Sequence, residues 1–161
     1  EVARGKLAKQ NPLVQLTAIN QSVFDADLTS LLHKVDLVLD CTDSPKTRKF
    51  INQACVEAKT KLVSASAIQG AGQLVSFDFS KSNSPCYQCL FPGGAEQSLS
   101  CSTSGVFSPL LGVMGGLQAA ESLKLLLGQD IKLNQLSLFD IWGQEMRAFN
   151  IKKDQSCGVC G

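Results

Sequence analysis

The stretch VDLVLDCTDSPKTRKFINQACVEAKTKLVSASA, residues 35–67, decides the fold class of this chain. Two apolar runs rich in branched side chains, at residues 35–40 and 61–67, flank a more polar segment. Both runs have the length and composition of buried strands. The segment between them opens with Ser44, a good helix N-cap, and with Pro45, which suits the first helical position.

The segment between the two runs also has the periodicity of an amphipathic helix. Its apolar side is formed by Phe50, Ala54 and Ala58, which recur four residues apart. Its solvent-facing side is expected to carry Lys46, Arg48 and Lys49. A strand, a helix and a second apolar strand in this order predict a parallel sheet that is covered on both faces.

Outside this stretch, further strands are expected and the pattern changes along the chain. Residues 14–19, VQLTAI, form a β-branched run that predicts an earlier strand. Residues 73–79 alternate between apolar and polar side chains, as a half-exposed antiparallel strand does. Residues 136–141 and 146–151 are separated by a short polar turn, which predicts a hairpin or a meander.

A long helix is expected between these strands, over PLLGVMGGLQAAESLKLLLG at residues 109–128. Ser108 is its expected N-cap, Pro109 its first residue and Gly128 its end. The helix is apolar nearly all round, which places it either in the core or at an interface between subunits. The predicted fold is therefore α/β, a partial Rossmann-like parallel sheet that continues into antiparallel strands. We expect a single domain over residues 1–161.

Composition excludes several classes of protein. The chain has 161 residues, 44% of them hydrophobic, which is too apolar for a disordered protein. Lys and Arg number 15 against 14 Asp and Glu, so no basic surface for nucleic acid is expected. The long apolar helix is interrupted by Gln118, Glu121, Ser122 and Lys124, which argues against a membrane span. Seven cysteines with no secretory segment at the start indicate a reducing compartment, the cytoplasm.

Four of the cysteines form two CxxC pairs, Cys86 with Cys89 and Cys157 with Cys160. Two intervening residues allow both sulfurs of a pair to turn toward one ion, and two pairs complete a tetrahedral thiolate site. Zinc bound by four thiolates has no open position, so its role is expected to be structural. The alternative is two separate redox pairs or four unpaired thiols.

Two acidic residues, Asp40 and Asp43, follow the first strand of the opening stretch, where the helix begins. Ligands of open α/β sheets bind outside the carboxyl ends of the strands. A carboxylate at this position suits Mg²⁺, which takes oxygen ligands and accompanies phosphates. Alternatively, Asp43 only helps to cap the helix beside Thr42 and Ser44.

Cys101 lies in a polar loop rich in Gly and Ser, residues 92–106. An exposed thiol near the start of a helix is a candidate nucleophile, whereas Cys41 and Cys55 lie in apolar surroundings. The alternative, an unreactive cysteine, is favoured by spacing alone, because the one histidine, His33, is far away in sequence. His33 itself is expected at a helix end.

Three stretches together resemble the ThiF/MoeB/HesA adenylyltransferases, bacterial relatives of the ubiquitin-activating enzymes. They are residues 36–74, the CYQCL pair at 86–90 with the closing CGVC at 157–160, and residues 100–126. The resemblance covers nearly the whole chain in the right order. The thiamine-biosynthesis branch is matched best, on LVSASAIQGAGQL, CLFPGG and LSLFDIWGQEMRAFNIKK.

The resemblance implies an ATP- and Mg²⁺-dependent enzyme that adenylates the C-terminal glycine carboxylate of a ubiquitin-fold sulfur-carrier protein. It implies that Asp43 holds the Mg²⁺ of ATP and that the two CxxC pairs bind zinc. Cys101 matches a cysteine that the thiamine branch uses in covalent sulfur transfer, whereas MoeB-like members do without it. A homodimer is also implied.

The family's glycine-rich nucleotide loop and its cationic phosphate contacts would precede Glu1. We therefore expect this chain to be the C-terminal two-thirds of the domain, and to be inactive alone. Two alternatives stand beside the thiamine branch. One is MoeB-type activation of the small subunit of molybdopterin synthase, and the other is a fragment that binds the carrier without catalysis.

Overall fold

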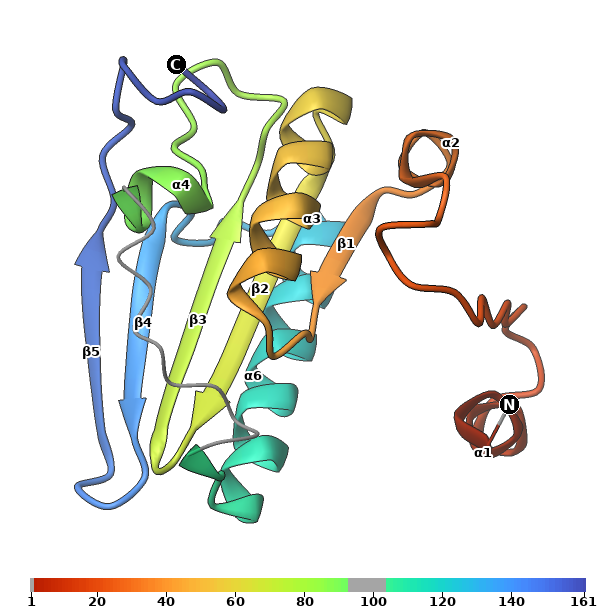
Figure 1. The fold of residues 1–161 in the computed structure, drawn as a ribbon. Coiled ribbons are helices and arrows are strands. Elements are labelled where there is room, and N and C mark those ends of the chain that lie inside the picture. Colours follow the sequence, from red (N-terminus) through yellow and green to blue (C-terminus); the bar gives the residue numbers. More distant parts are fainter. Residues whose placement is uncertain (1, 93–103) are drawn as a thin grey trace.

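The computed structural model describes residues 2–92 and 104–161 of the chain (Figure 1). Its helices and strands, in chain order, are α1 (Val2–Gln10), α2 (Leu28–Leu32), β1 (Leu37–Asp40), α3 (Pro45–Ala58), β2 (Lys61–Ile68), β3 (Ala71–Phe77), α4 (Tyr87–Leu90), α6 (Ser108–Leu126), β4 (Gln135–Asp140) and β5 (Glu145–Asn150). None of the helices in this part of the chain has the length and apolar character that crossing a bilayer needs.

The strands form one five-stranded sheet in the order β1-β2-β3-β4-β5. β1 and β2 are parallel, and every later pair is antiparallel. The parallel pair is joined through α3, as the strand–helix–strand pattern of residues 35–67 predicts. The hairpin of β4 and β5 also confirms the pattern of the last two apolar runs. The predicted change from parallel to antiparallel pairing is therefore confirmed.

Helices cover both faces of the sheet (Figure 1). On β2, Leu62 faces the cluster on the α3 side, while Val63 and Ala65 face the cluster under α6. On β3, Phe77 belongs to the cluster on the α3 side and Leu74 to the cluster under α6. Residues 74–79 are accordingly buried on both faces, and the prediction of a half-exposed strand over residues 73–79 is wrong because a helix or a loop covers each side.

α3 begins as the sequence predicts, with the Ser44 hydroxyl accepting a hydrogen bond from the Thr47 amide at 3.5 Å. The start of α6 differs by one residue: Phe107 occupies the N-cap position and Ser108 is the first helical residue. α6 ends just before Gly128, whose φ of +67° lies in the left-handed region.

The N-terminal region contradicts one prediction, since residues 14–19 form no strand. A strand needs a neighbour for its backbone N–H and C=O groups. In the described part of the chain, β1 pairs only with β2, and no strand lies beside residues 14–19. α1 has no buried residue, and Leu13 is 94% exposed. Val14 and Ile19 of this run are about half exposed, at 51% and 50%, as expected for a segment outside the sheet.

Candidate active site and metal centre

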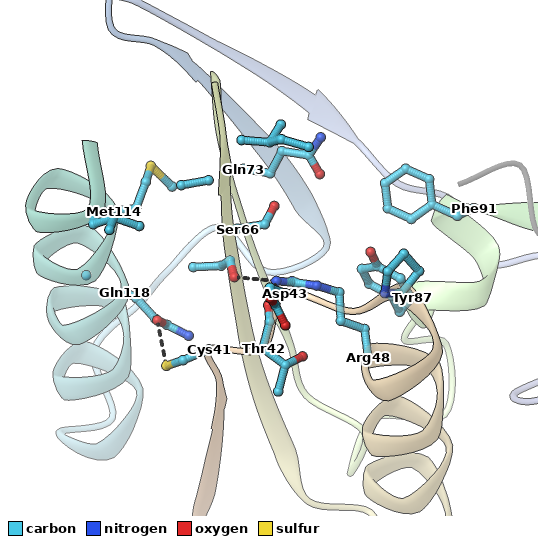
Figure 2. A pocket seen from close by; sticks show the side chains of 16 residues that line it. Cys41, Thr42, Asp43, Arg48, Ser66, Gln73, Tyr87, Phe91, Met114 and Gln118 are labelled. Atoms are coloured by element: carbon cyan, nitrogen blue, oxygen red, sulfur yellow. Dashed lines mark hydrogen bonds between the residues drawn. The ribbon is translucent and has the colours of Figure 1, made fainter. Parts of the chain in front are cut away.

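A cavity of about 450 Å³ lies at the carboxyl ends of β1 and β2. β2 extends four residues past β1, because Asp40 at the end of β1 pairs with Ser64 while β2 continues to Ile68. Figure 2 shows Met114 and Gln118 of α6 on one side of the cavity, and Arg48, Tyr87 and Phe91 on the other. The end of a parallel strand pair is where open α/β sheets bind ligands.

Both oxygens of the Asp40 carboxylate accept hydrogen bonds at the turn that follows β1. Its Oδ1 accepts hydrogen bonds from the Thr42 amide at 3.0 Å and from the Thr42 hydroxyl at 2.7 Å. Its Oδ2 accepts a third from the Ser64 hydroxyl at 2.8 Å, and the side chain is 1% exposed. A buried carboxylate with these partners fixes the backbone around it and is not available as a ligand.

Asp43, three residues further along, is in the opposite situation. It is exposed, and it contributes to the lining of the cavity. Within residues 2–92 and 104–161, its side chain has no hydrogen-bond or ion-pair partner. The capping role goes to the Ser44 hydroxyl, so Asp43 is not needed as a cap. Of the two aspartates that the sequence offers at this turn, Asp43 is the one available to a cation.

Arg48 joins the turn to β2, and the prediction that it faces solvent on α3 is wrong. Its residue is only 6% exposed. The guanidinium donates to the carbonyl oxygen of Thr42, to that of Ala65 at 3.0 Å and to the Ser64 hydroxyl at 3.0 Å. Nη1 also lies 3.6 Å from Oδ2 of Asp40. Arg48 therefore compensates the buried charge of Asp40 and ties the turn to the cavity wall.

Arg48 and Gln118 belong to this site although no sequence motif indicated them. Gln118 occupies the buried row of α6, and it is 4% exposed. Its position was visible as a polar residue four places after Met114 in that row. Cys41 also differs from expectation, because it is exposed in the cavity rather than buried in apolar surroundings.

The four cysteines of the two CxxC pairs gather at the top of the sheet, where the tail after β5 meets α4. Their sulfurs all lie within 4.8 Å of one another. Cys86 Sγ and Cys157 Sγ are 3.8 Å apart, and Cys89 Sγ and Cys160 Sγ are 3.4 Å apart. Thiolates that each lie about 2.3 Å from one zinc ion in tetrahedral geometry are about 3.8 Å apart. This donor set could hold a metal ion and fits zinc.

The thiol pKa values in this cluster diverge. Burial opposes ionisation of Cys157, but hydrogen bonds from the Val159 and Cys160 amides outweigh it and lower the pKa of Cys157 to about 7. Burial raises the pKa of Cys86 and, together with the neighbouring sulfurs, that of Cys160. A bound divalent cation favours deprotonation of all its thiol ligands. Among the described residues outside the cluster, Cys55 is also buried; burial raises its pKa to about 12, which disfavours the reactive thiolate.

Cys101 and His33 are the two other residues that the sequence singled out. Cys101 lies outside the described residues. His33 occupies the C-cap of α2, where its amide bonds to carbonyl oxygens of the helix, as expected for a helix-end residue.

Known proteins resemble this chain over its whole length. A model of the ThiF family matches residues 1–159. The sulfur carrier protein ThiS adenylyltransferase of Escherichia coli K12 is 40% identical over 161 residues, which are 100% of this chain and 64% of that protein. The molybdopterin-synthase adenylyltransferase of the same organism is 38% identical over 162 residues, 100% of this chain and 65% of that protein. The chain thus spans slightly less than two thirds of these relatives.

Solved structures share the fold. The crystal structure of E. coli MccB with ATP superposes with a TM-score of 0.77 at 21% identity, over 99% of this chain and 49% of that one. A heterocyclase in complex with substrate and cofactor gives a TM-score of 0.63 at 15% identity, over 89% of this chain and 24% of that one. At these identities the likeness establishes the mixed sheet and its helices.

Proposed function

We propose that this chain, which belongs to the ThiF family, is the C-terminal two-thirds of an adenylyltransferase domain that activates a ubiquitin-fold sulfur-carrier protein. The observation that carries the proposal is that Asp43 lines a cavity at the ends of two parallel strands and that its carboxylate has no partner among residues 2–92 and 104–161. Two relatives whose names contain adenylyltransferase, at 40% and 38% identity, support the reaction class.

In the proposed reaction, the C-terminal carboxylate of the carrier attacks the α-phosphorus of ATP. The bond to the bridging oxygen breaks, pyrophosphate leaves, and an acyl-adenylate forms. Asp43 would hold a Mg²⁺ ion, which neutralises charge on the triphosphate when it is bound. Asp40, Arg48 and Gln118 contribute by holding the turn that carries Asp43 and by keeping the cavity wall in place.

The Cys86, Cys89, Cys157 and Cys160 cluster would bind zinc as a structural site. Four thiolate ligands would leave no position for a substrate, and the ion would join residues 157–160 to the segment around α4. A thiolate site of this kind suits a reducing compartment, so we place the protein in the cytoplasm. Cys101 is proposed as the thiol that takes part in sulfur transfer after adenylation.

A homodimer is part of the proposal. The outer side of α6 exposes Leu123 at 60% and Leu126 at 53%, while its inner side packs on the sheet. An exposed apolar helix side of this kind is typical of an interface between subunits.

Within the family, we propose the carrier of thiamine thiazole biosynthesis as the substrate. The stretches LVSASAIQGAGQL, CLFPGG and LSLFDIWGQEMRAFNIKK support this branch. Activation of the small subunit of molybdopterin synthase is the second candidate, which the 38% identity to a molybdopterin-synthase adenylyltransferase favours.

Mass spectrometry of the full-length protein mixed with ATP, Mg²⁺ and each purified carrier tests this proposal. We expect an AMP adduct on the ThiS-like carrier, and a covalent adduct on Cys101 when a sulfur donor is added. An adduct on the molybdopterin-synthase subunit alone would assign the second candidate. Binding of a carrier without any adenylate would identify a non-catalytic module.

A further inference from the structure

A buried glutamine on α6 reaches the end of β1 from the side of the sheet opposite to Arg48. The buried row of α6 contains Leu110, Met114, Gln118, Ser122 and Leu125. Gln118 is therefore a primary amide among mostly apolar side chains, at 4% exposure. Burying an amide without partners is unfavourable, so its hydrogen bonds decide what it contributes.

The carboxamide of Gln118 has a partner for each of its polar atoms. Nε2 donates to the carbonyl oxygen of Asp40 at 2.9 Å and to that of Val63 at 3.0 Å. Oε1 accepts a hydrogen bond from the Cys41 thiol at 3.3 Å. Asp40 is the last residue of β1, and Val63 of β2 pairs with Leu39 of β1. The Gln118 side chain therefore joins the two parallel strands where the turn begins.

The turn after β1 is also held from the α3 side of the sheet. There the Asp40 carboxylate binds Thr42, and Arg48 donates to the Thr42 carbonyl oxygen. The bonds from α6 and from α3 thus converge on residues 40–42, directly before Asp43. Because Asp43 has no partner of its own in the described part of the chain, its position depends on these neighbours.

We propose that Gln118 is a positioning residue for adenylation: its carboxamide fixes the end of β1 and thereby presents Asp43 to the cation of the substrate. This inference rests on the proposed function. Gln118 also lines the cavity, so direct contact with a substrate is the competing explanation that an experiment must separate.

Two variants of the full-length protein test the proposal. Gln118→Met has a similar volume but removes the N–H donors to two carbonyl oxygens and the acceptor of the Cys41 thiol. Gln118→Glu keeps the acceptor for the Cys41 thiol and loses both N–H donors, so it should behave like the methionine variant. Ser122→Ala is the matched control, because the Ser122 hydroxyl is buried in the same row but donates within α6, to the Gln118 carbonyl oxygen at 2.8 Å.

The first measurement, amide hydrogen exchange of residues 41–44, needs no catalysis. We expect both Gln118 variants to accelerate exchange there about tenfold, the effect of losing one hydrogen bond, and Ser122→Ala to leave it unchanged. Unchanged exchange in both Gln118 variants, or equal acceleration in the control, would overturn the proposal. If the methionine variant does not fold, the glutamate variant decides.

The second measurement is carrier-dependent ATP–pyrophosphate exchange at varied Mg²⁺. A positioning residue predicts a rise of about tenfold in the Mg²⁺ concentration for half-maximal rate, with the KM for the carrier unchanged. A raised KM for ATP or carrier with normal hydrogen exchange at residues 41–44 would assign Gln118 to substrate contact instead. No pyrophosphate exchange by the wild-type protein with either carrier would overturn the proposed function and, with it, the catalytic part of this inference.

Discussion

Arg48 has a role that its place in the helical pattern did not indicate. The periodicity of α3 put it on the solvent side, yet its side chain extends over the end of the sheet and is 7% exposed. A long aliphatic stem lets a charged group reach a buried partner several ångströms from its own helix face. Its partner, Asp40, carries a charge that the interior accepts only when it is paired and hydrogen-bonded.

Replacing Arg48 with methionine is predicted to lower the free energy of unfolding by about 3 to 5 kcal/mol, because the Asp40 carboxylate would remain buried without its cation. Denaturant unfolding measures the loss. Arg147→Met is the control, since Arg147 pairs with Glu145 on the surface with its side chain 70% exposed. There we expect a change of about 0.5 kcal/mol or less. Equal losses in the two variants would contradict the buried role of Arg48.

At the scale of elements, α6 packs closely on β3, and Met114 occupies the space beside Gly72. A Cβ added at Gly72 would lie 2.2 Å from Sδ of Met114. We predict that Gly72→Ala lowers the free energy of unfolding by about 1 to 3 kcal/mol, as overpacking of a core does. Met114→Ala should cost less in the Gly72→Ala background than in the wild type. Additive losses in this double-mutant cycle would show that the two residues do not compete for space.

The cysteine cluster lies where residues 152–161 meet α4, and the proposed zinc ion would link the two segments. We predict about one zinc ion per chain by elemental analysis, and its loss in Cys160→Ser. Hydrogen exchange in residues 152–161 should then rise, because the tail would lose its attachment. Cys41→Ser is the control that keeps all four ligands, and it should retain the metal. Full zinc content in Cys160→Ser would rule out the four-thiolate site.

The sequence was sufficient to predict features that depend on adjacent residues. It was insufficient for features that depend on residues far away in sequence. The N-cap of Ser44 and the apolar strands around α3 follow from adjacent residues and are confirmed. The paired CxxC spacing predicted which four sulfurs meet. By contrast, residues 14–19 have the composition of a strand but no neighbouring strand in the described structure. Gln118 looked like an interruption of an apolar helix, because its three partners lie at least 55 positions away in sequence.

At the scale of the whole molecule, the cavity with Asp43 would be one part of what the proposed adenylation requires. The chain covers 64% of the E. coli ThiS adenylyltransferase, so more than a third of that relative's length has no counterpart in residues 1–161. We therefore predict that the 161-residue chain alone catalyses no ATP–pyrophosphate exchange, even with a carrier present. The full-length protein assayed in parallel is the control. Exchange by the chain alone would show that residues 1–161 suffice.

The most direct test of the central claim is ATP–pyrophosphate exchange by the full-length protein carrying Asp43→Ala, with its carrier present. The matched control is Asp36→Ala, because Asp36 is an exposed carboxylate before the opposite end of β1. We predict a rate about 10² to 10³ times lower for Asp43→Ala, with carrier affinity unchanged and the control at the wild-type rate. An Asp43→Ala protein that exchanges pyrophosphate at the wild-type rate would contradict the assignment of this carboxylate to catalysis.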